Sequence, residues 1–334
     1  MRIEAAAGGY RAGMVTVGYT LMCEQTPPKD LVDYAVRAEE AGFDLAVMSD
    51  HYYPWLDAQG HSPYAWSVLG AAAYATSRID LMSFVTCPIR RYHPAVVAQK
   101  AATVGLLSDG RFTLGLGAGE NLNEHVVGAW PHVEQRHDMF GEALEIIRPL
   151  LAGETISFSG EYFDVPEAYL WDRPETPVPM AIAASGPSSA DLAGTHGDAI
   201  VAVEPDASVL RLFDEAGGQG KPRYGQVAIC WGPDEAECRK IVHDQWRWFG
   251  LGWKVNAELP GPDSFAGASQ FVREEDVASA VPCGPDVERH VEAFRKFVDA
   301  GFTHVALVQV GGESQPAFLD WAGRELLPRL KDLR

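Results

Sequence analysis

The sequence has few cysteines, and their spacing excludes the sites that cysteine clusters build. Five occur in 334 residues, an odd number without any CxxC pair: Cys23, Cys87, Cys230, Cys238 and Cys283. Neither a disulfide framework nor a zinc site is therefore predicted. The ten histidines form no HxH or HExxH pattern, so no metal site is expected. We interpret this cysteine usage as that of a protein from the reducing cytoplasm.

Basic residues are scarce as well. The chain has 27 lysines and arginines against 46 acids, which gives a formal net charge of -19. Such a charge repels phosphate backbones and anionic lipid headgroups, so nucleic-acid binding is not expected. No apolar run reaches the length of a signal peptide or a membrane span, and residues 1–13 are interpreted as an N-terminal extension. We expect no membrane contact.

Apolar and charged residues occur in globular proportions, 47% and 22%. Short apolar or β-branched segments alternate with longer amphipathic ones. The predicted strands are 15–19, 44–48, 79–85, 112–117, 178–183, 199–203, 226–230 and 303–310. The predicted helices between or after them are 28–41, 63–75, 94–107, 132–151, 188–196, 207–216, 234–248 and 285–300. Eight such units predict an α/β fold of the closed (β/α)8 TIM-barrel type.

An open doubly wound sheet is the alternative to the barrel. It is less favoured, because no GxGxxG sequence follows the first predicted strand. Residues 14–334 are predicted to form a single barrel domain. Two segments interrupt the alternation, at about 153–176 and 252–281, and we interpret both as insertions. The second is expected to fold back over the barrel mouth, where loops after the strands build active sites.

His51 follows the second predicted strand, directly after Asp50. Histidine has an ordinary pKa near 6.5, which suits proton transfer at neutral pH, and a neighbouring carboxylate fixes its tautomer. The alternative is that Asp50 caps the next turn and that His51 is a solvated loop residue. The position at a strand end favours an acid/base role for His51.

Glu120 follows the fourth predicted strand, beside Gly117 and Gly119. Small residues allow a flat ring to approach the backbone, and the carboxylate supplies a second titratable group opposite His51. A helix cap in a glycine turn is the alternative. Trp55 and Tyr53 are candidates for stacking on substrate or cofactor, although ordinary packing is the more frequent role of aromatic residues in such loops.

Four small residues end the fifth predicted strand and lead into a helix: Ala183, Ala184, Ser185 and Gly186. Free N–H groups at a helix start bind phosphates, and side chains of this size do not block the approach. A tight connection without a ligand is the alternative. Trp246 and Trp248 are interpreted only as anchors that hold a helix to its neighbours.

Six motifs follow the strands in order along the chain. They are Gly18-Tyr19, Glu24-Gln25, Ser49-Asp50-His51, Pro54-Trp55, 91–94 and 117–124. With them the chain resembles, from about residue 15 to 330, the bacterial-luciferase-like superfamily, and within it the F420-dependent glucose-6-phosphate dehydrogenases. The resemblance implies a (β/α)8 barrel, commonly a homodimer, that binds the deazaflavin F420 at its C-terminal mouth. A hydride would pass there between F420 and a small-molecule substrate.

Matched residue by residue, the resemblance implies roles for the groups at the mouth. His51 would be the base that removes the hydroxyl proton, and Asp50 its orienting partner and a cofactor contact. Trp55 would stabilise the site near the transfer point, and Glu120 would be the acid beside the cofactor ring. Glu24 would be a carboxylate that faces the substrate.

The same resemblance implies cofactor contacts along the strand ends. Phe84 and Val85 match the position of a non-proline cis peptide bond behind the deazaflavin ring. Gly117 and Gly119 would lie against the cofactor, and Asn123 matches an asparagine that contacts it. Residues 183–186 match a backbone cradle for its phosphate tail.

The departures from the resemblance concern the substrate phosphate. The sugar-phosphate enzymes carry a lysine just after the sixth strand, where this chain has Glu204 and Asp206. Their later phosphate-binding cations have no counterpart either, since Lys254 and Arg273 do not align with them. We therefore expect a non-phosphorylated substrate, such as a secondary alcohol, a ketone or an activated alkene.

Three other functions remain open from the sequence. One is an FMN-dependent monooxygenase of the same superfamily, and another is an F420-dependent sugar-6-phosphate dehydrogenase. The third is a barrel that binds the cofactor without catalysis.

Overall fold

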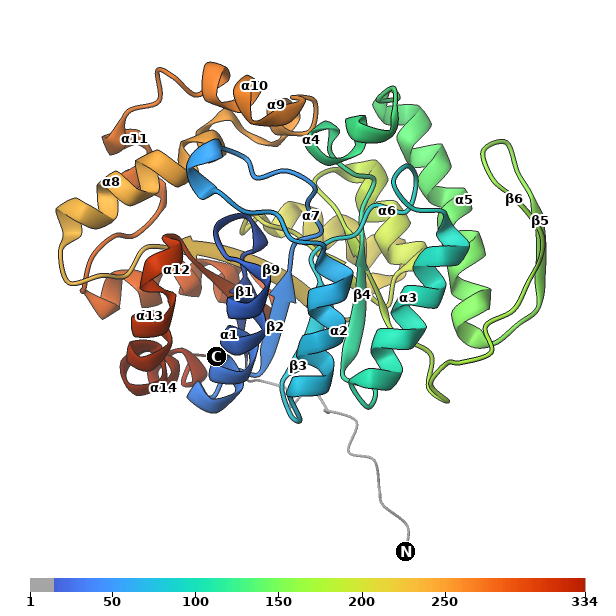
Figure 1. The fold of residues 1–334 in the computed structure, drawn as a ribbon, viewed down its shortest axis with the longest axis horizontal. Helices are drawn as coiled ribbons and strands as arrows, with labels where there is room; N and C mark the ends of the chain where they lie inside the picture. Colours follow the sequence, from blue (N-terminus) through green and yellow to red (C-terminus); the bar gives the residue numbers. More distant parts are fainter. Residues whose placement is uncertain (1–14, 334) are drawn as a thin grey trace, which may run out of the picture.

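The computed structural model describes residues 15–333 and contains a closed barrel of eight parallel strands (Figure 1). The strands are β1 (Thr16–Leu21), β2 (Leu45–Met48), β3 (Asp80–Ser83), β4 (Phe112–Leu116), β7 (Met180–Ala183), β8 (Ala199–Val201), β9 (Arg223–Ile229) and β10 (His304–Gln309). β1 pairs with both β2 and β10, which closes the ring. The predicted (β/α)8 barrel is confirmed, and each of the eight predicted strands is present.

The barrel strands are apolar along almost their whole length because both of their faces are covered. Every residue of β2 is buried, as are Val17 to Leu21 of β1. Neighbouring strands approach closely at small residues. A Cβ atom at Gly115 of β4 would lie 1.9 Å from the carbonyl oxygen of Ser83 on β3, so only glycine fits there.

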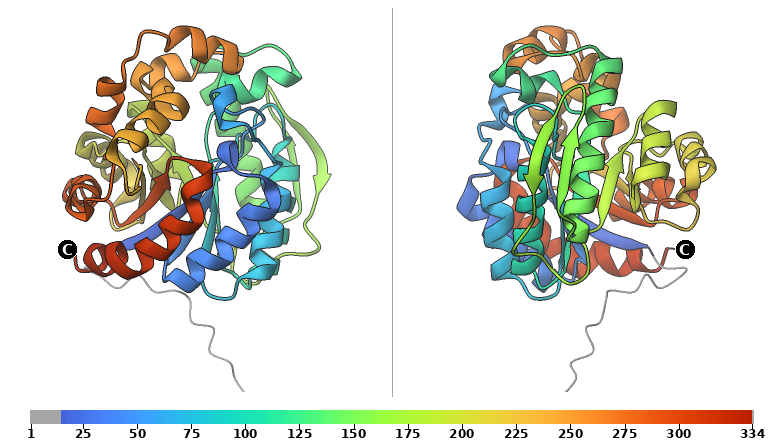
Figure 2. Two further views of the ribbon diagram at one scale, coloured as in Figure 1. Left: turned by 60° about the vertical axis from the view of Figure 1, so that its left-hand side comes forward. Right: turned by 90° about the vertical axis from the view of Figure 1, so that its right-hand side faces the viewer.

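Helices surround the barrel (Figure 2). They are α1 (Pro28–Ala41), α2 (Ala65–Ala75), α3 (Pro94–Leu107), α4 (Asn121–Glu124), α5 (Val133–Ala152), α6 (Pro187–His196), α7 (Ala207–Phe213), α8 (Glu235–Trp246), α12 (Val287–Ala300), α13 (Gln315–Trp321) and α14 (Leu327–Lys331). α1, α3 and α6 begin with proline, which suits the first helical turn. In α12 the buried residues His290, Val291, Phe294 and Phe297 recur at helical spacing and form the face that packs inward.

The first predicted insertion is an antiparallel hairpin of β5 (Ile156–Ser159) and β6 (Asp164–Ala168). It lies on the outside of α5 (Figure 1). The carboxylate of Glu142 on α5 accepts hydrogen bonds from three backbone N–H groups, those of Glu161, Tyr162 and Phe163. The hairpin is therefore fixed to the helix away from the barrel mouth.

The second predicted insertion forms three short helices, α9 (Trp253–Asn256), α10 (Gly261–Ala268) and α11 (Glu274–Ala280). It lies at the end of the barrel where α4 begins (Figure 1). The backbone N–H of Asn121 donates to the carbonyl of Ala257, and the Asn121 side chain donates to the carbonyl of Glu258. The Glu258 carboxylate pairs with the buried Arg136 guanidinium at 2.7 Å. This insertion is thus fastened to the segment that follows β4.

The predicted N-terminal extension, residues 1–13, lies outside the described residues. Within 15–333, no helix is long and apolar enough to cross a membrane. The five cysteines are free thiols, all of them buried. In the same part of the chain no cluster of histidine, cysteine and carboxylate side chains could hold a metal ion.

Candidate active site

His51 lies between two carboxylates at the C-terminal end of the barrel. Its Nδ1 atom is 3.0 Å from Oε1 of Glu24, which stands in the turn after β1, although the N–H does not point squarely at that oxygen. Its Nε2 atom is 3.5 Å from Oε2 of Glu120, which follows β4 and precedes α4. The His51 side chain is 9% exposed. The ends of β1, β2 and β4 therefore converge on one imidazole, as the barrel geometry predicts.

The charges around His51 change its titration. Burial alone lowers the pKa of the imidazole, but the charges of Glu24 and Glu120 outweigh burial and raise it to about 9. Burial would raise the pKa of Glu24, yet the His51 charge and hydrogen bonds hold it below its usual value. Burial raises the pKa of Glu120. His51 is therefore cationic at neutral pH, which its ordinary pKa near 6.5 did not predict.

The predicted pairing of Asp50 with His51 is wrong. Oδ2 of Asp50 accepts hydrogen bonds from Trp66 Nε1 at 3.1 Å and Thr86 Oγ1 at 2.9 Å. Its Oδ1 accepts one from the Tyr92 hydroxyl and lies 3.5 Å from the buried Arg91 guanidinium. Neighbouring residues in extended backbone point to opposite sides, so the carboxylate beside His51 in sequence turns away from it in space.

Glu24 takes the orienting position instead. Its side chain is only 3% exposed, and Oε1 also accepts a hydrogen bond from Ser49 Oγ at 2.8 Å. The Ser49 hydroxyl in turn contacts Cys23 Sγ at 3.2 Å. These contacts fix the Glu24 carboxylate behind the imidazole. Glu24 is thus a partner of His51, and its predicted role as a substrate-facing carboxylate stays a prediction.

Asn123 connects the loop after β2 to Glu120. Its Oδ1 atom accepts hydrogen bonds from the backbone N–H groups of Tyr52, at 2.8 Å, and Tyr53, at 3.4 Å. Its Nδ2 atom lies 3.3 Å from Oε2 of Glu120. Asn123 is 4% exposed. It therefore holds the loop after β2 against Glu120, while its predicted contact with a cofactor stays a prediction.

Aromatic rings cover one side of His51. The Trp55 ring meets the imidazole edge-on, with centroids 5.1 Å apart. Trp248 stacks flat on Trp55 at 4.0 Å and 7°, and Phe265 of α10 meets Trp55 at 5.0 Å and 85°. Tyr53 packs against the same apolar cluster and stacks on His125. The sequence analysis interpreted Trp248 only as a helix anchor and did not name Phe265, because their stretch carries no polar motif and is distant in sequence from Trp55.

Small residues gather beside this site at the predicted cofactor positions. The peptide bond between Phe84 and Val85 is cis, as predicted. A Cβ atom at Gly117 would lie 2.9 Å from Val85 Cγ2 and 3.4 Å from Ala183 Cβ. Gly119 has a φ of +85°, and a Cβ there would lie 2.5 Å from Cys87 Sγ. The ends of β3, β4 and β7 thus lie together, and the absence of a side chain at Gly117 and Gly119 allows a flat ring to approach the backbone there.

The predicted phosphate cradle opens α6. Ala183 ends β7, Ala184 bonds back to β8, and Gly186 is the residue before the first helical turn. The backbone N–H groups of Ser185 and Gly186 both point to Ser189 Oγ, at 3.1 and 3.3 Å. Nothing lies within 4 Å of the position of a Gly186 Cβ. Ser189, which the sequence did not nominate, holds the N–H groups that a phosphate would take.

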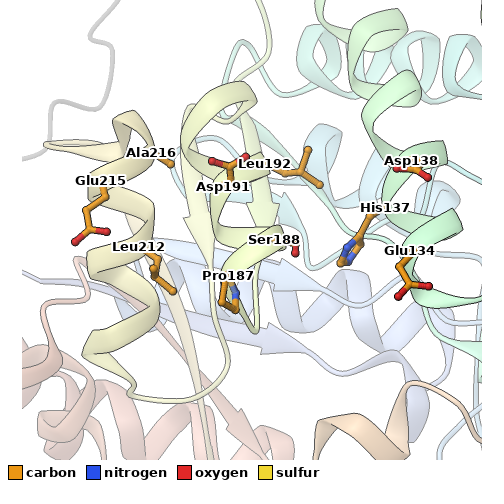
Figure 3. A pocket seen from close by; sticks show the side chains of 10 residues that line it. All are labelled: Glu134, His137, Asp138, Pro187, Ser188, Asp191, Leu192, Leu212, Glu215 and Ala216. Carbon is orange, nitrogen blue, oxygen red and sulfur yellow. The ribbon is translucent and has the colours of Figure 1, made fainter.

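An open cleft lies next to this cradle and not above His51. It has a volume of about 750 Å³ and runs between α5, α6 and α7 (Figure 3). Its lining residues are Glu134, His137, Asp138, Pro187, Ser188, Asp191, Leu192, Leu212, Glu215 and Ala216. Four of the ten are acids, so the cleft does not complement an anion. We therefore place the chemistry at His51 on the strength of its contacts.

Comparison with known proteins identifies the family. The model of the luciferase-like monooxygenases matches residues 11–304. The chain belongs to this family. It is 36% identical over 331 residues to an F420-dependent glucose-6-phosphate dehydrogenase of Beutenbergia cavernae, covering 95% of this chain and 98% of that one. It is 38% identical over 325 residues to an F420-dependent hydroxymycolic acid dehydrogenase of Mycobacterium tuberculosis, covering 94% and 88%.

Solved structures share the fold of this chain. An F420-dependent secondary alcohol dehydrogenase in complex with an F420-acetone adduct matches with a TM-score of 0.87 and 30% identity, covering 95% of this chain and 99% of that one. A coenzyme F420 dependent tetrahydromethanopterin reductase from Methanopyrus kandleri matches with a TM-score of 0.75 at 20% identity, covering 95% and 99%, which shows the fold alone.

Within this luciferase-like barrel, the acids expected to exclude a substrate phosphate are exposed to solvent. Glu204 is exposed, and the Asp206 carboxylate caps α7 by accepting from the Ser208 N–H at 2.7 Å. Their repulsion of an anion is therefore weaker than predicted, because both carboxylates are solvated. Of the two cations that do not align with the phosphate site, Lys254 is exposed, and Arg273, the residue before α11, pairs with Asp276 of that helix.

Proposed function

We propose that the protein is an F420-dependent oxidoreductase that transfers a hydride between F420 and a small non-phosphorylated alcohol or ketone. The observation that carries this proposal is the buried His51 between Glu24 and Glu120 at the barrel mouth. Family relatives named as F420-dependent dehydrogenases support the choice of cofactor. Proton transfer to or from an oxygen must accompany hydride transfer at its carbon, and His51 supplies a group for it.

The proton can move in either direction at His51. In alcohol oxidation, the neutral imidazole takes the hydroxyl proton. In ketone reduction, the imidazolium gives a proton to the carbonyl oxygen. Because its two carboxylate neighbours raise the pKa of His51 to about 9, the resting site at neutral pH holds the proton that reduction consumes. Glu24 stays behind the ring in both directions and compensates the imidazolium charge.

The residues beside His51 fit a deazaflavin, which supplies the hydride acceptor or donor when bound. Phe84, Val85 and Gly117 would support its ring, since a Cβ atom at Gly117 would lie only 2.9 Å from Val85 Cγ2 and would fill the space beside it. Ser185 and Gly186 would hold its phosphate through their backbone N–H groups after Ser189 Oγ gives them up. The predicted cofactor contacts of Asp50 and Asn123 would compete with the hydrogen bonds that their side chains make within the protein.

The surroundings favour a substrate without a phosphate. The side of His51 that the aromatic rings cover is apolar, and burying a dianion against it without a cation is costly. Arg273 is occupied by Asp276, and Arg91 by Glu124 at 2.8 Å. A secondary alcohol, a ketone or an activated alkene meets none of this cost. Tyr53 and Trp55 would contact its apolar part.

The test is a titration of the purified protein with F420 and, separately, with FMN, followed by fluorescence quenching. We expect micromolar or tighter binding of F420 and none of FMN. Secondary alcohols are then screened for bleaching of oxidised F420, with glucose 6-phosphate included. Tight binding of FMN alone would instead favour a luciferase-like monooxygenase. Turnover of glucose 6-phosphate at ordinary enzyme concentrations would favour a sugar-phosphate dehydrogenase.

We also propose that the protein is a homodimer through α2 and α3, which lie side by side on the barrel surface (Figure 1). Residues 62–77 carry no charge, and α3 contains only Lys100. Tyr74, Val96, Leu106 and Leu107 are large apolar side chains exposed on these helices. A net charge of -19 makes two copies repel each other over most of their surface. An uncharged apolar face is where a second copy gains most.

A further inference from the structure

Trp248 makes the closest parallel ring contact in the aromatic cluster near His51. Its ring lies 4.0 Å from that of Trp55, with an angle of 7° between their planes. The contact joins distant parts of the chain, since Trp55 follows β2 and Trp248 follows α8, in a 3-10 turn over Arg247–Leu251. Trp248 is 7% exposed, and its Nε1 atom has no hydrogen-bond partner. The ring is thus held by packing and not by a polar contact.

Trp55 has three aromatic neighbours, and they differ in what they fix. Trp248 covers its face, Phe265 meets it at 85°, and the His51 imidazole lies at 5.1 Å and 61°. A ring that is covered flat on one face keeps only its in-plane freedom, and the Phe265 contact restricts that as well. Trp248 and Phe265 therefore fix the orientation of the Trp55 ring. His51 contacts a ring that cannot turn.

The turn that carries Trp248 is itself fixed. Trp246 packs on Trp248 at 4.9 Å, and Phe249 meets it at 6.2 Å. His243 Nε2 lies 2.9 Å from the carbonyl oxygen of Val272, which ties α8 to the insertion. Movement of this turn would therefore move the ring that covers Trp55.

We propose that Trp248 is a positioning residue, which acts through Trp55 to set the orientation of the His51 imidazole between Glu24 and Glu120. The inference rests on His51 being the proton-transfer group of the proposed function. Nδ1 of His51 already sits off the line of a good hydrogen bond to Glu24, so that contact alone does not fix the ring. The Trp55 surface supplies the missing constraint.

The test reads the His51 ring directly, in the protein without cofactor or substrate. His51 is identified by its missing signal in H51N, in a protein labelled at histidine for NMR. Aromatic rings shift the resonances of nearby protons, so the His51 signals report where the Trp55 ring stands. We expect W55L and W248L to displace these signals, and W248F to displace them less because a smaller ring still covers Trp55.

The matched control is W246L. Trp246 is also 7% exposed and belongs to the same cluster, but its ring contacts are with Trp248 and Phe249. We expect the His51 signals to move less in W246L than in W248L, because Trp246 has no ring contact with Trp55 and acts on it only through Trp248. Wild-type His51 signals in folded W248L, with displaced ones in W55L, would overturn the proposal. If W248L does not fold, W248F is the test instead. Unshifted His51 signals in W248F would also overturn the proposal.

A kinetic measurement separates this inference from the function on which it rests. With F420 and an alcohol found by the screen, W248L is expected to lower kcat at least tenfold while F420 binds as tightly as before. Displaced His51 signals together with a wild-type kcat would support the positioning and count against His51 as the proton-transfer group.

Discussion

A histidine between two carboxylates holds its proton more tightly than an isolated one. In this chain the charges of Glu24 and Glu120 overcome the cost of burial and raise the pKa of His51 to about 9. The imidazole is neutral only above that pH. Its two chemical tasks, taking a proton and giving one, therefore have opposite pH dependences.

Alcohol oxidation is expected to accelerate with pH, because it needs the neutral imidazole. Below the pKa of about 9, kcat/KM should rise about tenfold per pH unit and then level off. Ketone reduction should be level below pH 9 and fall above it. Initial rates measured between pH 6 and 10 in both directions check this. A rise in oxidation that levels off near pH 6.5 would contradict it.

Removing the orienting carboxylate should shift that profile. Glu24→Gln keeps the size of the side chain and an acceptor for Ser49, but it removes the charge that contributes most to raising the pKa of His51. The pH profile of alcohol oxidation is expected to move to lower pH. Glu120→Gln should move it in the same direction by less, because its contribution is smaller. Equal profiles for E24Q and wild type would contradict the ion pair.

Loss of the imidazole should remove proton transfer and leave cofactor binding. His51→Ala is expected to slow hydride transfer by about a hundred- to ten-thousand-fold, the usual range for general acid/base catalysis. F420 affinity should be unchanged, since the proposed cradle lies at β3, β4 and β7. Single-turnover bleaching of F420 and fluorescence titration measure the two quantities. Unchanged turnover in H51A would remove His51 from the mechanism as the proton-transfer group.

The sequence predicted that His51 and Glu120 lie in one site, but it did not predict which carboxylate pairs with Nδ1 of His51. Position at strand ends was enough to nominate His51 and Glu120, because barrel geometry brings these ends together. The pairing of Asp50 with His51 was predicted from their adjacency in sequence. It is wrong because the Asp50 side chain points away from His51, and Glu24, which follows another strand, lies next to the imidazole. The raised pKa of His51 also depends on distances that a sequence does not contain.

At the level of elements, the segment between β4 and α4 depends on one glycine. Gly119 combines a φ of +85° with a close approach to Cys87, and Glu120 follows it directly. Gly119→Ala is expected to cost about 1–2 kcal/mol in backbone strain, with a further loss from the contact with Cys87. Because the strain falls beside Glu120, activity should fall as well.

Gly60→Ala is the matched control for this change. Gly60 has a similar φ of +82°, but nothing lies within 4 Å of its missing Cβ. It should show only the backbone cost in denaturant unfolding and should keep its hydride-transfer rate. Equal losses in G119A and G60A would contradict a role for the close contact at residue 119.

Alternation of apolar strands and amphipathic helices predicted the elements of the barrel, because the two periods differ clearly in sequence. The predicted strands nevertheless differ at their ends, as for β9, which begins at Arg223 and not at 226. The insertions were recognised only as interruptions. Nothing in 153–176 distinguishes a hairpin from a loop, and the stacking of Trp248 on Trp55 joins residues that no local pattern relates.

For the whole molecule, the proposed dimer predicts a concentration-dependent mass. Sedimentation equilibrium of the wild type is expected to give twice the mass of the chain. Leu106→Glu puts a charge on the apolar face of α3 and should give a monomer. Phe271→Glu is the control, because Phe271 is 86% exposed on the insertion and away from α2 and α3. A wild-type monomer, or a dimeric L106E protein, would contradict the predicted face.

The closed barrel assigns different tasks to the two halves of the chain. The groups proposed for proton transfer stand in the first half, between residues 24 and 123, whereas Trp248, Phe265 and the fastening loop at 256–258 stand in the second. Because Trp55 is proposed to contact the apolar part of the substrate, and Trp248 and Phe265 pack on Trp55, a chimaera that exchanges the segment from residue 246 to 283 with that of a relative is expected to alter which alcohols are accepted. For the chimaera to keep its hydride-transfer activity, the segment taken from the relative must place an aromatic ring over Trp55.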